Sequence, residues 1–81
     1  MRRSERPQPA LGAAVRQLRE KRGRTQEEIG EAAGLTGATV SLIERGHANP
    51  TWATVRDLAE ALDIPMGQLA KLADKLADAE K

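Results

Sequence analysis

Hydrogen-bonding side chains gather in one part of the chain, between residues 25 and 46. The hydroxyl and amide residues there are Thr25, Gln26, Thr36, Thr39 and Ser41. Hydroxyl and amide groups both donate and accept hydrogen bonds, and glycines between them let a backbone approach a partner closely. This combination suits the binding of an anionic or hydrogen-bonding surface better than it suits bond breaking.

Catalytic and metal-binding combinations are poorly represented. The chain has one histidine, His47, and no cysteine, which excludes disulfides, thiolate metal sites and thiol nucleophiles. There is no Ser/His/Asp set and no phosphate-cradling glycine loop after a strand. We therefore predict a protein that is not an enzyme, with no catalytic residue, no metal and no cofactor.

Basic residues concentrate near the start of the chain. The net charge of +1 divides into eight Arg/Lys against two Glu in residues 1–24, and five basic against ten acidic residues in 25–81. The basic third is a candidate for contact with nucleic-acid phosphates. The candidate phosphate contacts within it are Arg2, Arg3 and Arg6 in the first residues, then Arg16, Lys21, Arg22 and Arg24.

The elements that must position these residues are short helices. The apolar residues are almost all Leu, Ile, Val and Ala, and they recur at helical spacing. Thr25, Thr36 and Thr51 each precede such a segment, and Glu28 gives the first a T-x-x-E capping pattern. We predict a flexible basic arm over 1–9 and a single domain over 10–81, with its core in 10–70. Five helices are expected, the last spanning 65–79.

The second and third predicted helices form a distinctive pair. Gly34 ends one and Thr36 caps the next, a connection too short for antiparallel stacking, so the two helices should cross steeply. Gly30 leaves room where the two backbones approach, and Leu35 plugs the core. In such a unit the first helix crosses the DNA backbone and the second lies in the major groove.

Many spaced motifs extend this pattern from Leu11 to Leu69. They include Gly23-Arg24-Thr25-Gln26-Glu27-Glu28-Ile29, then Gly34-Leu35-Thr36, Ile43-Glu44-Arg45-Gly46 and Asn49-Pro50-Thr51. The sequence resembles the XRE family of Cro-like and phage-repressor-like helix-turn-helix proteins. The resemblance implies an all-α, five-helix, lambda-repressor-like domain that regulates transcription by binding double-stranded DNA.

The resemblance also implies roles for individual residues. Residues 36–45 would be the recognition helix, with base-reading positions at Gly37, Ala38, Ser41 and Leu42. Phosphate contacts would come from Arg24, Thr25, Gln26, Thr36, Thr39 and Asn49. Arg19 and Glu44 would form a structural ion pair. Relatives often carry Gln at position 37 and Arg, Lys or Gln at position 42. Gly37 and Leu42 cannot form such side-chain hydrogen bonds to bases, so few direct base contacts of this kind are expected here.

The last predicted helix suggests self-association. Its stripe of Leu69, Leu72, Ala73 and Leu76 extends past the family core, and a second copy is the simplest surface to cover it. The alternative is a longer helix folded back on its own core. Trp52 stands where relatives have an aliphatic residue, so we expect it in the core or in a dimer contact.

These observations together predict a cytoplasmic regulator without an effector domain that binds pseudo-palindromic DNA as a homodimer. No membrane segment and no small-molecule effector are expected. The alternative is a protein-interaction module on the same fold, such as an antitoxin or a bridging factor.

Overall fold

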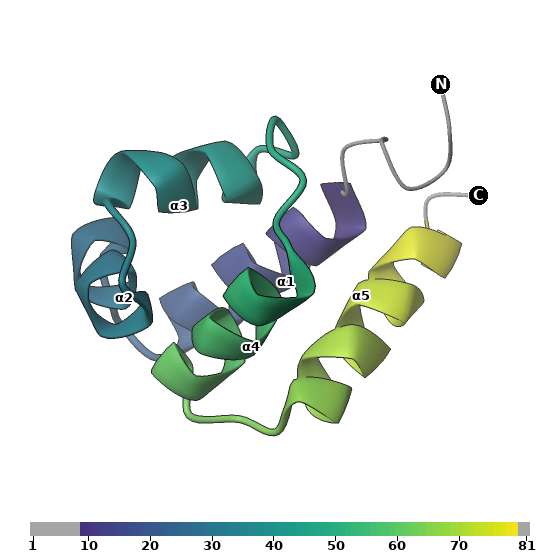
Figure 1. Cartoon of the computed structure of the whole chain (residues 1–81). Helices are drawn as coiled ribbons and strands as arrows, with labels where there is room; N and C mark the ends of the chain where they lie inside the picture. Colours follow the sequence, from purple (N-terminus) through teal and green to yellow (C-terminus); the bar gives the residue numbers. More distant parts are fainter. Residues whose placement is uncertain (1–8, 80–81) are drawn as a thin grey trace.

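Threonine side chains begin three of the five helices. The computed structural model describes residues 9–79, and its helices are α1 (Pro9–Lys21), α2 (Gln26–Ala33), α3 (Gly37–Glu44), α4 (Trp52–Ala61) and α5 (Met66–Ala79) (Figure 1). Thr25, Thr36 and Thr51 precede α2, α3 and α4, and each side chain accepts a hydrogen bond from the backbone N–H three residues later. These N–H groups have no partner within the helix, so the caps stabilise the helix starts. The five helices and the three caps predicted from the sequence are confirmed.

The connection between α2 and α3 is a tight turn. Gly34 adopts the left-handed conformation, with φ 75° and ψ 28°, which a residue with a Cβ rarely enters. The backbone N–H of Leu35 donates to the carbonyl of Gly30 over 2.7 Å. A Cβ added at Gly30 would lie 2.8 Å from the Leu35 carbonyl oxygen. The predicted close approach of the two helices is therefore present at Gly30.

Aliphatic side chains from all five helices and their ends fill one core. Helix α1 packs against α3 and α5, and α2 packs against α3 and α4. The largest fully buried side chains are Val15, Ile29, Val40, Leu58, Leu62 and Leu69. Burying these groups supplies the main free energy that holds the short helices together, since helices of this length are marginal alone.

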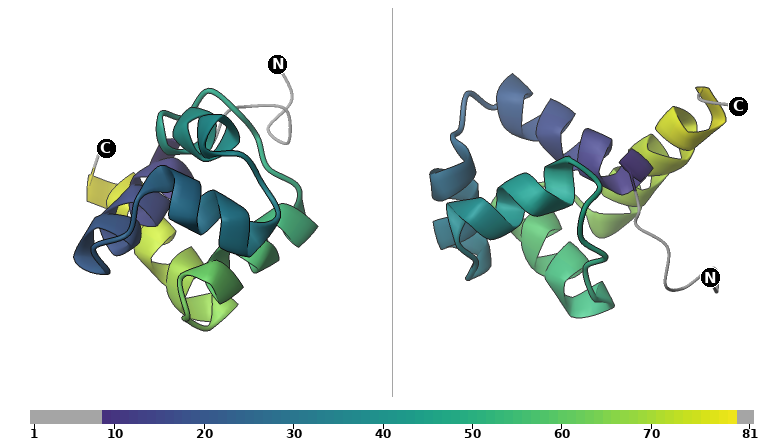
Figure 2. Two further views of the ribbon diagram at one scale, coloured as in Figure 1. Left: turned by 90° about the vertical axis from the view of Figure 1, so that its left-hand side faces the viewer. Right: turned by 90° about the horizontal axis from the view of Figure 1, so that it is seen from above.

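Helix α5 lies along α1, on the side of the molecule away from α3 (Figures 1 and 2). Leu69 is 0% exposed, so the prediction that it contacts a second copy is wrong: its side chain is buried in the core of its own chain. Leu72, Ala73 and Leu76 are partly buried against the same core. The helix thus folds back on its own domain, and its second half keeps part of the stripe accessible.

Trp52 is the largest exposed side chain, with 67% of its surface accessible. It is the first residue of α4, directly after the Thr51 cap. The inner face of α4 is occupied by Val55, Leu58 and Ala59. The interpretation of Trp52 as a core residue is therefore wrong, because the helix turns this position toward solvent.

Candidate nucleic-acid interface

Helix α3 is anchored by one face and exposed on the other. Val40 and Ile43 are 0% and 2% exposed and fix α3 to the core. On the opposite face Ala38 is exposed, and Leu42 keeps 40% of its surface accessible. Ser41 is half-buried. Figure 1 shows α3 along an outer side of the molecule, where a large partner can reach it.

The outer face of α3 has little hydrogen-bonding capacity. The hydroxyl of Ser41 can donate and accept, whereas Ala38 and Leu42 offer only apolar contact. In a major groove, apolar side chains of this kind contact thymine methyl groups. Gly37 is half-buried and brings no side chain.

An ion pair joins α1 to the end of α3. Arg19 donates from Nε to Oε2 of Glu44 over 2.7 Å and from Nη2 to Oε1 over 3.0 Å. Its Nη1 donates to the carbonyl of Arg24 over 2.8 Å. The side chains of Arg19 and Glu44 are only 13% and 2% exposed. The hydrogen bond to Glu44 raises the pKa of Arg19 above its ordinary value, so this cation stays charged.

Gln26 belongs to the same network. Its Nε2 donates to Oε1 of Glu44 over 3.0 Å, which ties the start of α2 to the end of α3. A carboxamide nitrogen carries two hydrogens, so a second donor remains for a phosphate. Gln26 is half-buried and therefore partly accessible.

The other sequence-predicted phosphate contacts lie at helix starts and in loops. Thr25 and Thr36 are exposed, and both already serve as caps. The hydroxyl of Thr36 donates to that of Thr39 over 3.0 Å, and Thr39 is half-buried. Arg24 and Asn49 are exposed on either side of the α2–α3 unit, in the loops before α2 and after α3.

Two basic residues, Arg16 in α1 and Arg22 directly after it, have partners within the domain. Arg16 pairs with Glu20 over 3.5 Å, and Arg22 lies 3.9 Å from a carboxylate oxygen of Asp63. The predicted arm, with Arg2, Arg3 and Arg6, lies outside the described residues. Sequence analysis gave no role to Arg45, although an arginine directly after α3 was a usable signal. Arg45 is exposed there and adds positive charge beside the outer face of α3.

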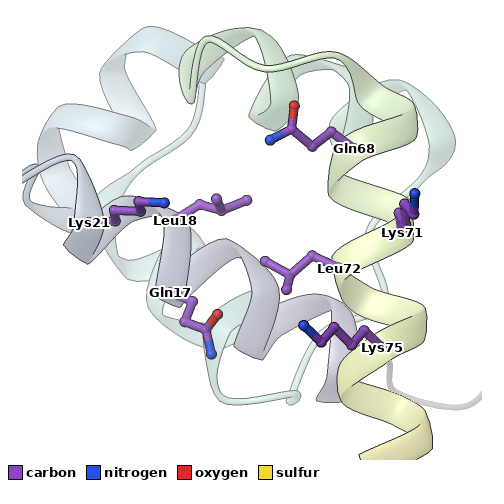
Figure 3. A pocket seen from close by; sticks show the side chains of 7 residues that line it. All are labelled: Gln17, Leu18, Lys21, Gln68, Lys71, Leu72 and Lys75. Carbon is purple, nitrogen blue, oxygen red and sulfur yellow. The ribbon is translucent and has the colours of Figure 1, made fainter.

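A groove of about 500 Å³ lies on the surface where α1 and α5 meet (Figure 3). Leu18 and Leu72 face one another across it. Its lining residues are Gln17, Leu18, Lys21, Gln68, Lys71, Leu72 and Lys75. Lys21 therefore belongs to this lysine-rimmed groove, with no acidic residue in its lining.

Within residues 9–79, no three His, Cys, Asp or Glu side chains gather closely enough to hold a metal ion. In the same part of the chain, no helix has the length and apolar character required to cross a membrane.

Two capped helices meeting at a glycine turn, with the outer face of the second exposed, define a helix-turn-helix DNA-binding domain. The sequence matches the helix-turn-helix domain family over residues 10–72. The chain belongs to this family and, within it, to the XRE type of transcriptional regulators, as the sequence predicted.

Relatives and solved structures agree with this assignment. The HTH-type transcriptional regulator y4dJ of Sinorhizobium fredii is 35% identical over 65 residues, which are 80% of this chain and 84% of that protein. The restriction-modification controller protein C.AhdI of Aeromonas hydrophila is 34% identical, with a TM-score of 0.73 over 75% of this chain and 92% of that one. The clp gene regulator ClgR of Corynebacterium glutamicum is 28% identical, with a TM-score of 0.80 over 84% and 88%. These proteins are transcriptional regulators, not enzymes.

Proposed function

We propose that this DNA-binding regulator inserts its recognition helix into the major groove of a specific operator. This helix covers residues 36–45, which are α3 and one residue at each of its ends. The observation that carries the proposal is the two-faced character of α3. Val40 and Ile43 hold it rigidly from behind, and Ala38 and Leu42 face outward. A helix held in this way can be pressed into a groove without rearranging the core.

The residues around α3 would contact the phosphates of the two DNA strands. Arg24 and Asn49 flank the unit, and Gln26 keeps one N–H for a phosphate. Thr25, Thr36 and Thr39 mark the helix starts, where backbone N–H groups favour anions. Phosphate contacts of this kind set the register of a protein on DNA, and base contacts by Ala38, Ser41 and Leu42 would supply specificity.

A homodimer on a pseudo-palindromic operator is the assembly we propose. The accessible part of Leu72, Ala73 and Leu76 on α5 would form the contact between copies. The two copies of α3 would then lie about 34 Å apart, one helical turn of DNA. We place the protein in the cytoplasm and assign it no small-molecule effector.

Selection of duplexes from a random pool tests this proposal. We expect an enriched motif with two related half-sites, containing thymines opposite Ala38 and Leu42. Affinity should fall with salt by about 0.9 in log–log slope for each phosphate contacted. Changing exposed Leu42 to Asp should abolish selection without unfolding the domain, and changing exposed Asp57 of α4 to Leu is a matched control on another helix. Equal affinity for all duplexes would contradict the proposal.

A protein partner for the same face is the second candidate, as in an antitoxin or a bridging factor. The exposed Leu42 favours it, because apolar side chains at an accessible helix face also bind proteins. Two results together would favour this candidate: no electrophoretic mobility shift with any duplex at low ionic strength, and a complex with a protein partner that Leu42→Asp abolishes.

A further inference from the structure

We propose that Glu27 of α2, rather than a side chain of α3, reads the base that faces the start of the recognition helix, and that this base is a cytosine. The inference rests on the proposed function, because it presupposes that α3 enters the major groove. It concerns a residue to which the sequence analysis gave no role in binding.

The geometry of Gly37 is the first observation. A Cβ built on Gly37 would lie 3.0 Å from Cγ of Glu27, 3.1 Å from its Oε1 and 3.2 Å from its Cδ. The Glu27 side chain therefore occupies the space into which a side chain at position 37 would project. Gly37 lies at the first position of α3, which is a base-reading position in this type of domain, so the carboxylate stands in for the missing side chain.

Exposure and charge are the second observation. Glu27 is exposed, and among residues 9–79 no ion pair involves its carboxylate. No acidic residue lies in the first turn of α3 itself. The carboxylate of Glu27 thus lies beside the first residue of α3, at the N-terminal end of that helix.

The chemistry of the carboxylate selects the base. A charged carboxylate only accepts hydrogen bonds. In the major groove, cytosine presents its N4 amino donor, whereas guanine presents two acceptors and adenine places the N7 acceptor beside its amino group. Cytosine is therefore the base that Glu27 accepts with least repulsion. The same negative charge repels phosphates, so Glu27 lowers affinity for unrelated duplexes and sharpens discrimination.

Duplex selection with matched variants tests the inference. The wild type should enrich cytosine at one position of each half-site. Glu27→Ala should lose that preference by about fivefold or more while the rest of the motif remains, and Glu27→Gln should shift it toward adenine, to which Gln bonds well. Affinity for an unrelated duplex should rise severalfold in both. The control is Glu31→Gln, the same charge change on an exposed residue of α2 that lies near Arg24, Glu28 and Ala32; its motif should stay unchanged.

Gly37→Ala provides a second, independent variant. Its new Cβ meets the flexible end of Glu27, so the carboxylate must leave its place while the backbone stays. We expect this variant to select the Glu27→Ala motif and to keep the wild-type circular dichroism spectrum. A wild type that binds and selects a motif shared unchanged by Glu27→Ala overturns this inference alone. A wild type that selects no motif overturns both the inference and the proposed function.

Discussion

At the residue scale, the buried carboxylate of Glu44 is bonded by side chains of two other helices. Its carboxylate accepts from Arg19 and Gln26, and through them it connects α1, α2 and the end of α3. An acidic residue near a helix C-terminus is unfavourable by itself, so these partners compensate for its position. The network fixes the orientation of α3 relative to the residues proposed to grip the strands.

Glu44→Ala should therefore be strongly destabilising. It leaves the Arg19 guanidinium nearly buried without its partner, and breaking such a pair costs about 3–5 kcal/mol. We expect Tm to fall by more than about 10 °C for a domain of this size. Thermal unfolding followed by circular dichroism measures it, with exposed Glu60→Ala on α4 as the control. Equal Tm values for the two variants would contradict the argument.

The capping box of α2 predicts a pH dependence. The backbone N–H of Thr25 donates to Glu28 over 2.9 Å, and this bond, with a smaller effect of the Thr25 side chain, lowers the pKa of Glu28 below its ordinary 4.5. A lowered pKa stabilises the folded state fully above pH 4.5, and the gain disappears as the pH falls through the lowered value. Urea unfolding of wild type and Glu28→Gln should thus differ near neutral pH and converge in acid. A constant difference at every pH would be inconsistent with this cap.

At the element scale, the crossing of α1 and α3 depends on Gly12. A Cβ at Gly12 would lie 2.9 Å from the carbonyl oxygen of Glu44 and even closer to that of Ile43, so two backbones would have to separate. Gly67 in α5 offers a matched control, since a Cβ there meets nothing within 4 Å.

Gly12→Ala should destabilise the domain and Gly67→Ala should stabilise it. The first change forces the helices apart, at a cost of about 1–3 kcal/mol. The second removes a helical glycine, which is worth up to about 1 kcal/mol. Chemical denaturation of both variants measures the two signs. If both substitutions change the free energy of unfolding in the same direction, the close approach of α1 to α3 is not the reason that position 12 requires glycine.

The same scale shows what the sequence could and could not predict. Thr25, Glu28 and Gly34 were identified correctly because their hydrogen bonds and backbone angles involve residues only a few positions away. Leu69 as a dimer contact and Trp52 as a core residue were wrong predictions, since their exposure depends on how α5 and α4 rotate against the rest of the core. The placement of the Glu27 side chain in the space beside Gly37 was missed for a related reason: periodicity within one helix carries no signal for a side chain lying on another.

At the scale of the whole molecule, the proposed dimer gives two leucines of α5 different roles, one in the core and one at the interface. Leu69 is buried in its own chain, so Leu69→Ala should cost about 2–5 kcal/mol of folding free energy. Leu76 is partly accessible, and Leu76→Asp should raise the dimer dissociation constant at least about fivefold, as expected for an interface residue worth more than about 1 kcal/mol. Analytical ultracentrifugation over a concentration series measures this constant. A wild type that stays monomeric at high micromolar concentration would contradict the dimer.

The groove between α1 and α5 has a consequence for assembly. Lys21, Lys71 and Lys75 line it, and a two-fold axis passing there would set each cationic rim against its own image. Divalent anions such as sulfate would bridge the opposing ammonium groups, whereas chloride would only screen them. In the proposed dimer, the identity of the counter-ion would then enter the monomer–dimer equilibrium, and a change of buffer would alter occupancy of paired half-sites without altering a single contact to DNA.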